Sequence, residues 1–199
     1  MKEIKGRTKI INYLIKKYNL KSYLEIGCAY KHNFNMVECE DKIGVDPAYD
    51  CDYKMISDEF FKVNGLKFDL IFIDGLHHWE QVYRDFINAT AILNSGGFIL
   101  MHDCLPTCKE QQGREKHPIV GLTAWTGDVW KAIVKLREQG WDIKTIDSDW
   151  GIGLYKFGAL KNRTCVDSDG IALLSYKFYE QHRDKLLNVI SLEQFYDSY

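Results

Sequence analysis

Several features that mark membrane-bound, secreted or nucleic-acid-binding proteins are missing from this sequence. None of its apolar stretches approaches the roughly 20 residues that a membrane-spanning helix needs. The 26 Lys and Arg residues are balanced by 28 Asp and Glu residues, so the net charge of -2 creates no basic field for nucleic acid or anionic lipid. Residues 1–18 are basic, but charges interrupt their apolar positions and no small-residue cleavage site follows, which favours an amphipathic helix over a signal peptide. We therefore expect a cytoplasmic protein with no membrane or nucleic-acid partner.

A pair of metal-binding cysteine arms is also missing. The six cysteines are Cys28, Cys39, Cys51, Cys104, Cys108 and Cys165. In a chain without a secretory signal, cysteines are reduced thiols by default. Cys104 and Cys108 make one loose arm with His102 and His117 nearby, whereas structural zinc sites usually have two arms of the C-x-x-C type. The sequence therefore favours free thiols over disulfides or a structural zinc site.

Strand and helix signals alternate along most of the chain. Apolar runs that end in polar residues, glycine or proline predict strands at 22–27, 41–47, 52–57, 67–75 and 98–103. Apolar residues at helical spacing predict helices at 5–19, 57–65, 82–93 and 127–140, and residues 141–157 are predicted to form a hairpin. Within the second helix, Ser57 is expected to be the cap and Gly65 the end. The helix at 127–140 is expected to start at its acidic residue and stop at its glycine.

This order of elements predicts the fold class. Strands that alternate with helices form a mostly parallel sheet with helices on both faces, and here an antiparallel hairpin would close it. We expect an α/β fold in which residues 1–160 form the main domain with its N-terminal helix. Residues 161–199 would form a helical C-terminal extension that is rich in aromatic residues. The extension would pack on the main domain or build the contact of a homodimer.

Polar residues follow all five predicted strands. They are Glu25 and Gly27, then Asp46, then Ser57 and Asp58, then Asp74, Gly75 and His77, and finally His102 and Asp103. Each of them alone has a structural explanation as a turn or cap residue. In an open parallel sheet, however, the carboxyl ends of the strands meet at one edge, where ligands bind. The convergence of all five groups on that edge predicts a functional site.

The first two strand ends indicate the kind of ligand. Asp46 follows Gly27 at the spacing of about 20 residues that lets a carboxylate hold ribose hydroxyls. The turn after the first strand, "EIGCAYKHNF", lacks the G-x-G-x-x-G pattern that brings backbone amides against a pyrophosphate. A nucleoside cofactor without phosphates fits this turn. S-adenosylmethionine, a nucleoside with a sulfonium and an amino-acid tail, is the natural candidate.

At this point the sequence resembles the class I S-adenosylmethionine-dependent methyltransferases. The resemblance is carried in order by "YLEIG", "GVDP", "FDLIFIDGLH", "GGFILMHDCLP" and "GDVWKAI", and it spans roughly residues 20–157. It implies a Rossmann-like, doubly wound fold. It also implies an O-methyltransferase of the branch that acts on small molecules, with a sugar or polysaccharide precursor as the expected acceptor.

The resemblance also implies roles for individual residues. Glu25 and Gly27 would shape the methionine pocket, with Cys28 and Asn33 beside it. Asp46 would bind the ribose, Ser57 and Asp58 would lie near the adenine, and Gly75 and His77 would complete the cofactor wall. Asp74 would face the methyl-transfer site. The stretch "GCAYKHN" departs from the family, which commonly has further glycines there.

A metal ion and a general base remain open at the sequence level. Some relatives of the catechol and caffeoyl-CoA type hold magnesium at positions that correspond to Asp74, His102 and Asp103. Histidine in that set is a departure, because imidazole suits zinc, iron, nickel or copper and magnesium prefers oxygen. His77 or His102 would be the general base, with Asp74 or Asp103 orienting it or holding a metal. His78 is expected to be structural.

Two other classes of function are compatible with the same residues. A metal at Asp74, His102 and Asp103 could support a hydrolase or an oxygenase-type enzyme on this scaffold. Alternatively, the chain could be a non-catalytic methyltransferase-like domain that keeps its cofactor and binds a partner.

Overall fold

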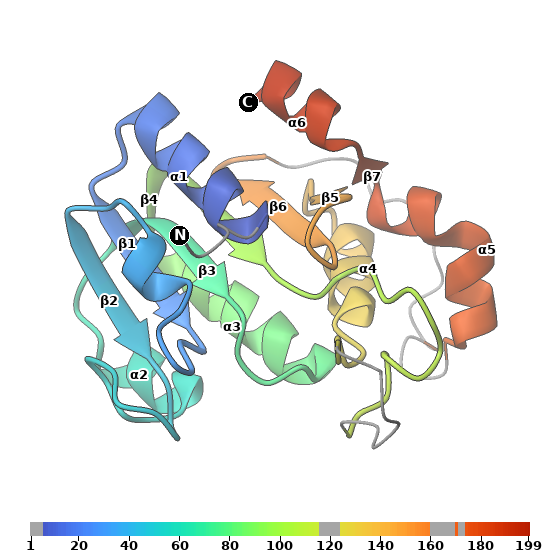
Figure 1. Ribbon diagram of the computed structural model, residues 1–199, viewed down its shortest axis with the longest axis horizontal. Coiled ribbons are helices and arrows are strands. Elements are labelled where there is room, and N and C mark those ends of the chain that lie inside the picture. The colour runs from blue at the N-terminus through green and yellow to red at the C-terminus, as the bar shows by residue number, and fades with distance from the viewer. Residues whose placement is uncertain (1–5, 116–123, 160–169, 171–173) are drawn as a thin grey trace.

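A seven-stranded sheet organises the computed structural model, which describes residues 6–115, 124–159, 170 and 174–199. The strands lie in the order β2-β1-β3-β4-β6-β5-β7 (Figure 1). Their bounds are β1 Ser22–Ile26, β2 Asp41–Val45, β3 Phe68–Ile73, β4 Leu93–Met101, β5 Lys144–Ile146, β6 Ile152–Lys156 and β7 Val189–Ile190. The first four pair in parallel, and β6 runs antiparallel to both β4 and β5. The predicted parallel sheet with a closing hairpin is confirmed.

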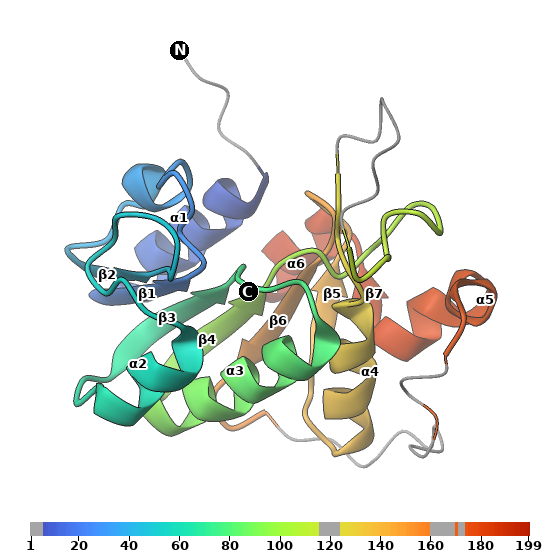
Figure 2. The ribbon, with the colours of Figure 1, turned by 90° about the horizontal axis from the view of Figure 1, so that it is seen from below.

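Helices cover both faces of this sheet. They are α1 Gly6–Tyr18, the short 3-10 helix η1 Phe34–Met36, α2 Ser57–Val63, α3 Trp79–Ile92, α4 Trp130–Glu138, α5 Tyr176–Leu187 and α6 Leu192–Ser198. Helices α2, α3 and α4 lie on one face and α1 and α6 on the other (Figures 1 and 2). Two hydrophobic clusters correspond to these faces, one containing Phe86 of α3 and Ile133 of α4, and the other containing Ile10 and Leu14 of α1. Burial of these apolar faces is the main favourable term in folding.

One predicted strand is wrong. Residues 52–57 do not join the sheet as a strand, and only a single bridge pairs Tyr53 with Val45. The carboxylate of Asp52 accepts the amide hydrogen of Gly44 at 2.8 Å. This amide of β2 is therefore not available to a neighbouring strand. Tyr53 and Met55 instead pack their side chains against the core. A side-chain hydrogen bond has here replaced the ladder that the apolar pattern predicted.

Two predicted helix boundaries are also wrong. Ser57 is the first residue inside α2 rather than its cap, because Ile56 holds the cap position, and the helix gives way to Asn64 before Gly65. Helix α4 starts at Trp130 instead of residue 127. The acidic residue before it, Asp128, accepts the amide hydrogen of Trp79 at 2.9 Å and so satisfies the start of α3.

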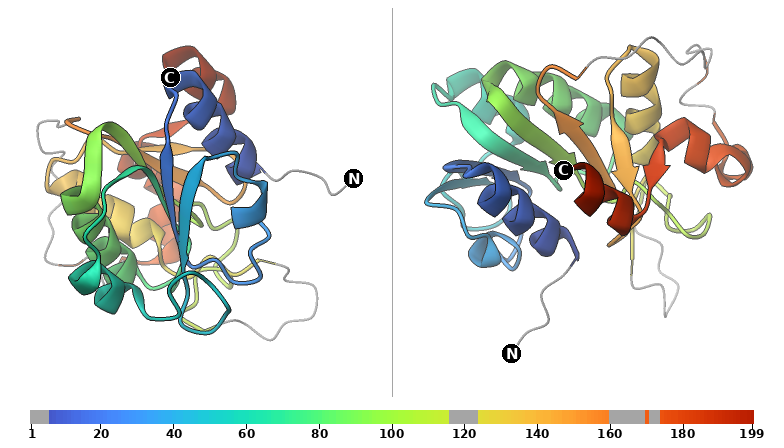
Figure 3. Two further views of the ribbon diagram at one scale, coloured as in Figure 1. Left: turned by 90° about the vertical axis from the view of Figure 1, so that its left-hand side faces the viewer. Right: turned by 90° about the horizontal axis from the view of Figure 1, so that it is seen from above.

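The C-terminal residues are integrated into the same structure. Strand β7 pairs in parallel with β5, and α6 lies beside α1 (Figure 3). The ring of Tyr13 in α1 meets those of Phe195 and Tyr196 at centroid distances of 5.5 and 4.7 Å. The division of the chain at residue 160 stays a prediction. No helix within the described ranges is long and apolar enough to span a membrane.

Candidate functional site

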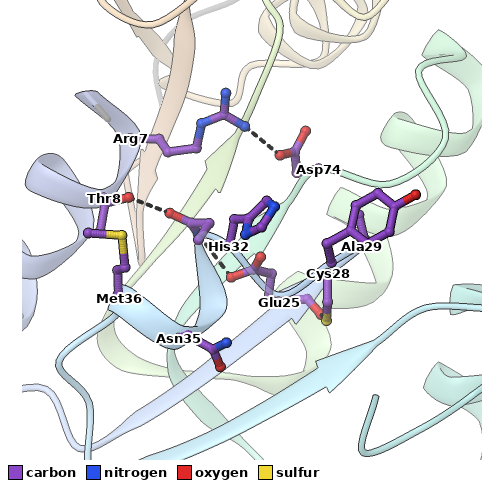
Figure 4. Close-up of a pocket in the computed structure, with 12 residues that line it drawn as sticks. Arg7, Thr8, Glu25, Cys28, Ala29, His32, Asn35, Met36 and Asp74 are labelled. Carbon is purple, nitrogen blue, oxygen red and sulfur yellow. Dashed lines mark hydrogen bonds and ion pairs between the residues drawn. The ribbon is translucent and has the colours of Figure 1, made fainter. Parts of the chain in front are cut away.

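Two adjoining cavities open at the carboxyl ends of β1, β2 and β3, on the edge where the sequence predicts a site. The first has a volume of about 640 Å³ and the second of about 480 Å³. Gly27, Ala29 and Asp74 line both, so the cavities meet above the end of β1. Figure 4 shows the first cavity, with Glu25 from β1 and Arg7 from α1 facing it. The two cavities therefore adjoin at these shared residues.

Gly27 allows the chain to pass between these cavities. Its φ of +91° is a conformation that side-chain-bearing residues rarely adopt. A Cβ atom there would lie 2.2 Å from the carbonyl oxygen of Asp74 and 2.6 Å from Cα of Gly75. The ends of β1 and β3 can therefore approach each other only with glycine at this position.

A buried carboxyl group forms the floor of the first cavity. Glu25 is only 1% exposed, and its Oε2 accepts hydrogen bonds from the Tyr23 hydroxyl at 2.5 Å and from the Asn33 amide at 2.9 Å. Asn33 in turn accepts from the hydroxyl of Thr8 in α1 at 2.7 Å. Burial raises the pKa of Glu25 to about 7, although both hydrogen bonds act to lower it. Burial likewise raises the pKa of the neighbouring Cys28 thiol, which is therefore not ionised at neutral pH.

Asp46 organises the second cavity. Its Oδ1 accepts the amide hydrogens of Ala48 and Tyr49 at 2.8 and 3.1 Å, and its Oδ2 accepts that of Ala29 at 2.9 Å. This carboxylate therefore holds the turns after β1 and β2 together at the cavity wall.

The far end of the second cavity is polar. The amide of Gln81 donates to Ser57 Oγ, Asp58 Oδ1 and Asp85 Oδ1 at 3.1, 3.3 and 2.9 Å. Burial raises the pKa of Asp85 to about 6. The predicted Ser57 and Asp58 thus lie in the cavity, whereas Gln81 and Asp85 were missed, because α3 was judged from its apolar positions alone.

Four predicted residues meet around Asp74, which lines both cavities. Nε2 of His77 lies 3.6 Å from Asp74 Oδ1 and 3.3 Å from Asp103 Oδ2. Nδ1 of His102 lies 3.2 Å from the same Asp74 oxygen and 3.1 Å from the same Asp103 oxygen. Two carboxylates thus face two imidazoles in a confined space, and we name this group the reaction centre.

Each histidine of the reaction centre is held by a backbone carbonyl. Nδ1 of His77 lies 2.8 Å from the oxygen of Trp125, and Nε2 of His102 lies 2.7 Å from that of Asp149. A carbonyl oxygen can only accept, so both of these nitrogens carry a hydrogen. The opposite nitrogen of each ring therefore turns toward the carboxylates. By contrast, His78 contacts the Arg114 carbonyl oxygen at 2.9 Å and takes no part in the reaction centre.

The acidic and basic side chains of the reaction centre stabilise each other's charged forms. Burial alone would raise the pKa of Asp74, but His102, His77 and Arg7 hold that pKa well below its usual range. Burial alone would lower the pKa values of both histidines, but the surrounding aspartates raise them. In the absence of a further cation, the geometry therefore favours an ionised Asp74 beside protonated imidazoles.

Three of these residues could hold a metal ion. One donor atom each from Asp74, His102 and Asp103 lies within 4.8 Å of the others. Nδ1 of His102 is buried, and it has no well-formed hydrogen bond although carboxylate oxygens of Asp74 and Asp103 lie 3.2 and 3.1 Å away. A buried nitrogen without a hydrogen bond beside two carboxylates has the chemistry of a metal ligand.

Two charged residues beside the reaction centre were missed in the sequence. Arg7 of α1 binds Asp74 Oδ2 at 2.8 Å and Asp149 Oδ2 at 2.9 Å. Asp149 belongs to the turn between β5 and β6. Arg7 stands within the basic N-terminal helix and Asp149 within a "DSD" turn, so neither carries a local signal of function.

Comparisons with known proteins identify a domain within the chain and structures that share its fold. Residues 31–104, which contain Asp46, Asp74, His102 and Asp103, match the family model described as "Methyltransferase domain". No curated protein matches the sequence at a significant level.

Solved structures with a similar fold include three from bacteria and a fungus. A Staphylococcus aureus protein described as a caffeoyl-CoA O-methyltransferase has a TM-score of 0.58 at 16% identity, over 78% of this chain and 85% of that one. The methyltransferase PaMTH1 of Podospora anserina, bound to S-adenosylhomocysteine, has a TM-score of 0.55 at 16% identity, over 78% of each chain. The O-methyltransferase TomG of Streptomyces achromogenes, bound to S-adenosylmethionine, has a TM-score of 0.53 at 10% identity, over 78% and 80%.

The chain has the Rossmann-like α/β fold of these methyltransferase structures, as the sequence predicted. Residues 31–104 also match a methyltransferase domain, and this match supports the resemblance to S-adenosylmethionine-dependent methyltransferases that the sequence indicated. The sugar-related branch, the metal ion and the roles of individual site residues stay predictions.

Proposed function

We propose that the protein transfers the methyl group of S-adenosylmethionine to a hydroxyl group of a small, sugar-like molecule. The observation that carries this proposal is the reaction centre, where Nε2 of His77 lies 3.3 and 3.6 Å from the carboxylates of Asp103 and Asp74. Methyl transfer is an in-line displacement, and the acceptor hydroxyl must lose its proton as the new bond forms. Such a reaction needs a base and close alignment of the two reactants.

The two cavities suit the two ends of S-adenosylmethionine. Asp46 would hold the ribose in the second cavity, with Ser57 and Asp58 near the adenine. In the first cavity, the buried carboxyl of Glu25 would accept from the amino group of the methionine end. Gly27 lies between the two cavities, and a side chain there would collide with Asp74 and Gly75. Its lack of a side chain would let one ligand pass from one cavity to the other. When bound, S-adenosylmethionine supplies the methyl group on its sulfonium.

A divalent metal ion fits the reaction centre. The guanidinium of Arg7 pairs with Asp74 and Asp149, and Asp103 lies beside His102. When both imidazoles are neutral, three carboxylates face one permanent cation, and this excess of negative charge favours a metal ion. Asp74, His102 and Asp103 would be its ligands. Since a metal takes the place of a proton on its ligands, the raised pKa of His102 would fall on loading. A bound metal would supply a Lewis acid that makes the acceptor hydroxyl more acidic.

His77 is the better candidate for the general base. His102 is buried, with Nε2 committed to the Asp149 carbonyl and Nδ1 enclosed by two carboxylates. His77 lines the second cavity, and its Nε2 lies 3.6 Å from Asp74, which lines both cavities, so this nitrogen faces the place where an acceptor would meet the cofactor. Asp103 and Asp74 raise the pKa of His77, and a cation bound between these carboxylates would offset that effect and favour the neutral imidazole that a general base requires. We therefore assign proton removal to His77 and metal binding to His102.

The rim of the first cavity supports a sugar-like acceptor. Tyr30 is 70% exposed there, and its ring lies 6.0 Å from that of His32 and 4.6 Å from that of Tyr49. Asn35 adds an amide to the same cavity. Aromatic faces beside hydrogen-bonding groups suit a ring that has both apolar C–H faces and hydroxyl groups.

The first experiment measures cofactor binding. Titration calorimetry of the purified protein with S-adenosylhomocysteine should give a dissociation constant of micromolar order, about -8 kcal/mol in binding free energy. Asp46→Asn should weaken binding, since its carboxylate would hold the ribose. Asp50→Asn, a change of an exposed acid in the same loop, is the matched control. Equal affinity of Asp46→Asn and wild type would refute the ribose assignment.

The second experiment measures the reaction. Release of S-adenosylhomocysteine is followed across a panel of sugars, nucleotide sugars and phenols, with and without chelation. Turnover with hydroxylated sugars supports the proposal. Binding without turnover on any acceptor points instead to a non-catalytic domain. Metal-dependent hydrolysis or oxygen consumption that proceeds without S-adenosylmethionine points to the other enzyme class.

A further inference from the structure

A chain of contacts joins the N-terminal helix to the reaction centre. Arg7 donates from Nε and Nη2 to the two carboxylate oxygens of Asp149, at 2.9 and 3.2 Å, and the backbone amide of Arg7 adds a third bond at 2.9 Å. Nη1 of the same guanidinium reaches Asp74 Oδ2 at 2.8 Å. The paired N–H groups of arginine match a carboxylate with a fixed geometry. Helix α1, the β5–β6 turn and the end of β3 are thus connected through one side chain.

The turn that carries Asp149 has an unusual backbone. Asp149, Trp150 and Gly151 have φ angles of +47°, +65° and +86°, so three consecutive residues are left-handed. The first two of them bear side chains, and such conformations persist only where the surroundings enforce them. The amides of Leu105 and Cys104 donate to the carbonyls of Trp150 and Gly151 at 2.7 and 3.1 Å. The turn is therefore fastened to the segment that follows His102 and Asp103.

Arg7 and Asp149 each contact one side chain of the reaction centre and affect the direction in which it points. Arg7 holds Asp74 Oδ2, which leaves Oδ1 directed at the two histidines. The carbonyl oxygen of Asp149 accepts from His102 Nε2 at 2.7 Å, which leaves Nδ1 directed at the carboxylates. Arg7 thus holds Asp74 directly, and it holds His102 indirectly, by fixing through the Asp149 carboxylate the turn whose backbone carbonyl binds Nε2.

We propose that Arg7 and Asp149 are positioning residues for methyl transfer. They act through Asp74 and His102, and helix α1 is in this way a working part of the site. The proposal rests on the proposed function for its effect on turnover, but the effect on the orientation of His102 can be measured separately. A displacement of about 1 Å at a reaction centre can lower turnover by about 100-fold. We expect a loss in kcat of that order when the ion pair is removed.

The test compares Arg7→Gln and Asp149→Ala with matched controls. Lys9→Gln removes an exposed charge from the same helix, and Asp147→Ala removes a carboxylate, 56% exposed, from the same turn. Both variants at the ion pair should lose kcat with a much smaller loss of S-adenosylhomocysteine affinity, and both controls should behave as wild type. Arg7→Lys keeps the charge without the paired geometry and should recover part of kcat. Thermal melting with saturating S-adenosylhomocysteine identifies any variant that fails to fold.

A spectroscopic measurement keeps this proposal separate from the proposed function. In protein labelled with ¹⁵N-histidine, the Nε2 proton of His102 should give a downfield signal that exchanges slowly with water, assigned by its loss in His102→Gln. The signal should weaken or exchange rapidly in Arg7→Gln and Asp149→Ala. If it is unchanged in both, positioning is refuted whether or not methyl transfer is found. If wild type turns over no acceptor, the proposed function fails while this readout still decides the positioning role.

Discussion

The imidazole of His77 is held by both the backbone and the ring of Trp125. Its Nδ1 lies 2.8 Å from the Trp125 carbonyl oxygen, and the two rings stack with centroids 4.8 Å apart and planes inclined by 22°. Because Nδ1 must donate to that carbonyl, Nε2 faces Asp74 and Asp103. A single residue from the loop before α4 thus sets the orientation of the proposed base.

Replacing His77 should therefore abolish most turnover. We expect His77→Gln to lower kcat by about 10²- to 10⁴-fold, the range typical of a lost general base. His78→Gln, at the neighbouring position outside the reaction centre, should keep kcat close to wild type. Initial rates of S-adenosylhomocysteine release provide the measurement. Loss of activity in both variants alike would show that the helix start, rather than the base, had been damaged.

The donor set predicts which metal ions bind. With one imidazole nitrogen and two carboxylates, the site should hold zinc, manganese, cobalt or nickel more tightly than magnesium. Elemental analysis of purified protein and titration of the apo form with each ion would measure this. Asp103→Ala should remove the binding, and Asp147→Ala, outside the reaction centre, should preserve it. A site selective for magnesium alone would contradict the assignment of His102 as a ligand.

Gly27 should tolerate no side chain. In Gly27→Ala, the new Cβ would meet the Asp74 carbonyl oxygen at 2.2 Å in a backbone conformation that disfavours alanine. We expect the free energy of unfolding to fall by about 3 kcal/mol or more, toward the upper range for overpacking, with loss of cofactor binding. Gly65→Ala has no atom within 4 Å of its Cβ and should change stability by at most about 0.5 kcal/mol. Urea denaturation of both variants would measure the difference.

Glu25 should make stability depend on pH. Its pKa rises from 4.5 to about 7 on folding, because the carboxyl group is buried. Between these values the folded protein holds a proton that the unfolded chain has released, so stability falls as the pH rises. At about 1.4 kcal/mol per pH unit, the contribution amounts to roughly 3 kcal/mol between pH 5 and 8.

The variant Glu25→Gln isolates this contribution. Its cofactor-free form should lose less stability than wild type when chemical denaturation is repeated at pH 5 and at pH 8. Glu40→Gln, a change at a side chain that is 76% exposed, should follow the wild-type pH dependence. Parallel curves for wild type and Glu25→Gln would mean that the carboxyl group is already ionised at pH 5.

Most of the sheet could be predicted because its signals are local. The run at residues 68–73 is almost wholly buried, as its apolar residues indicated, and the helical stripe of α1 covers one face with Ile10, Ile11 and Leu14. The strand expected at 52–57 failed for a reason that no pattern reveals. The Asp52 carboxylate occupies the amide of Gly44, and only the folded turn brings these two groups together.

The residues of the site also divide into those with a local sequence signal and those brought in only by folding. Asp74, His77, His102 and Asp103 could be proposed because each follows a strand, and parallel strands end at one edge. Arg7 and Asp149 could not, and neither could the contact of Trp125 with His77, because these residues approach from elsewhere in the chain. Arg7 lies 67 residues from Asp74 and 142 from Asp149, and Trp125 lies 48 residues from His77.

By itself, the sequence determined that polar groups collect at the ends of parallel strands around a nucleoside-sized cleft. The tertiary structure decided which atoms of those groups face one another. The end of a strand fixes the backbone position of a residue, because strands can be predicted from local apolar patterns. The direction in which an imidazole or a carboxylate points depends on hydrogen-bond partners from distant segments, here the carbonyls of Trp125 and Asp149 and the guanidinium of Arg7. Only the packed fold brings those partners into reach.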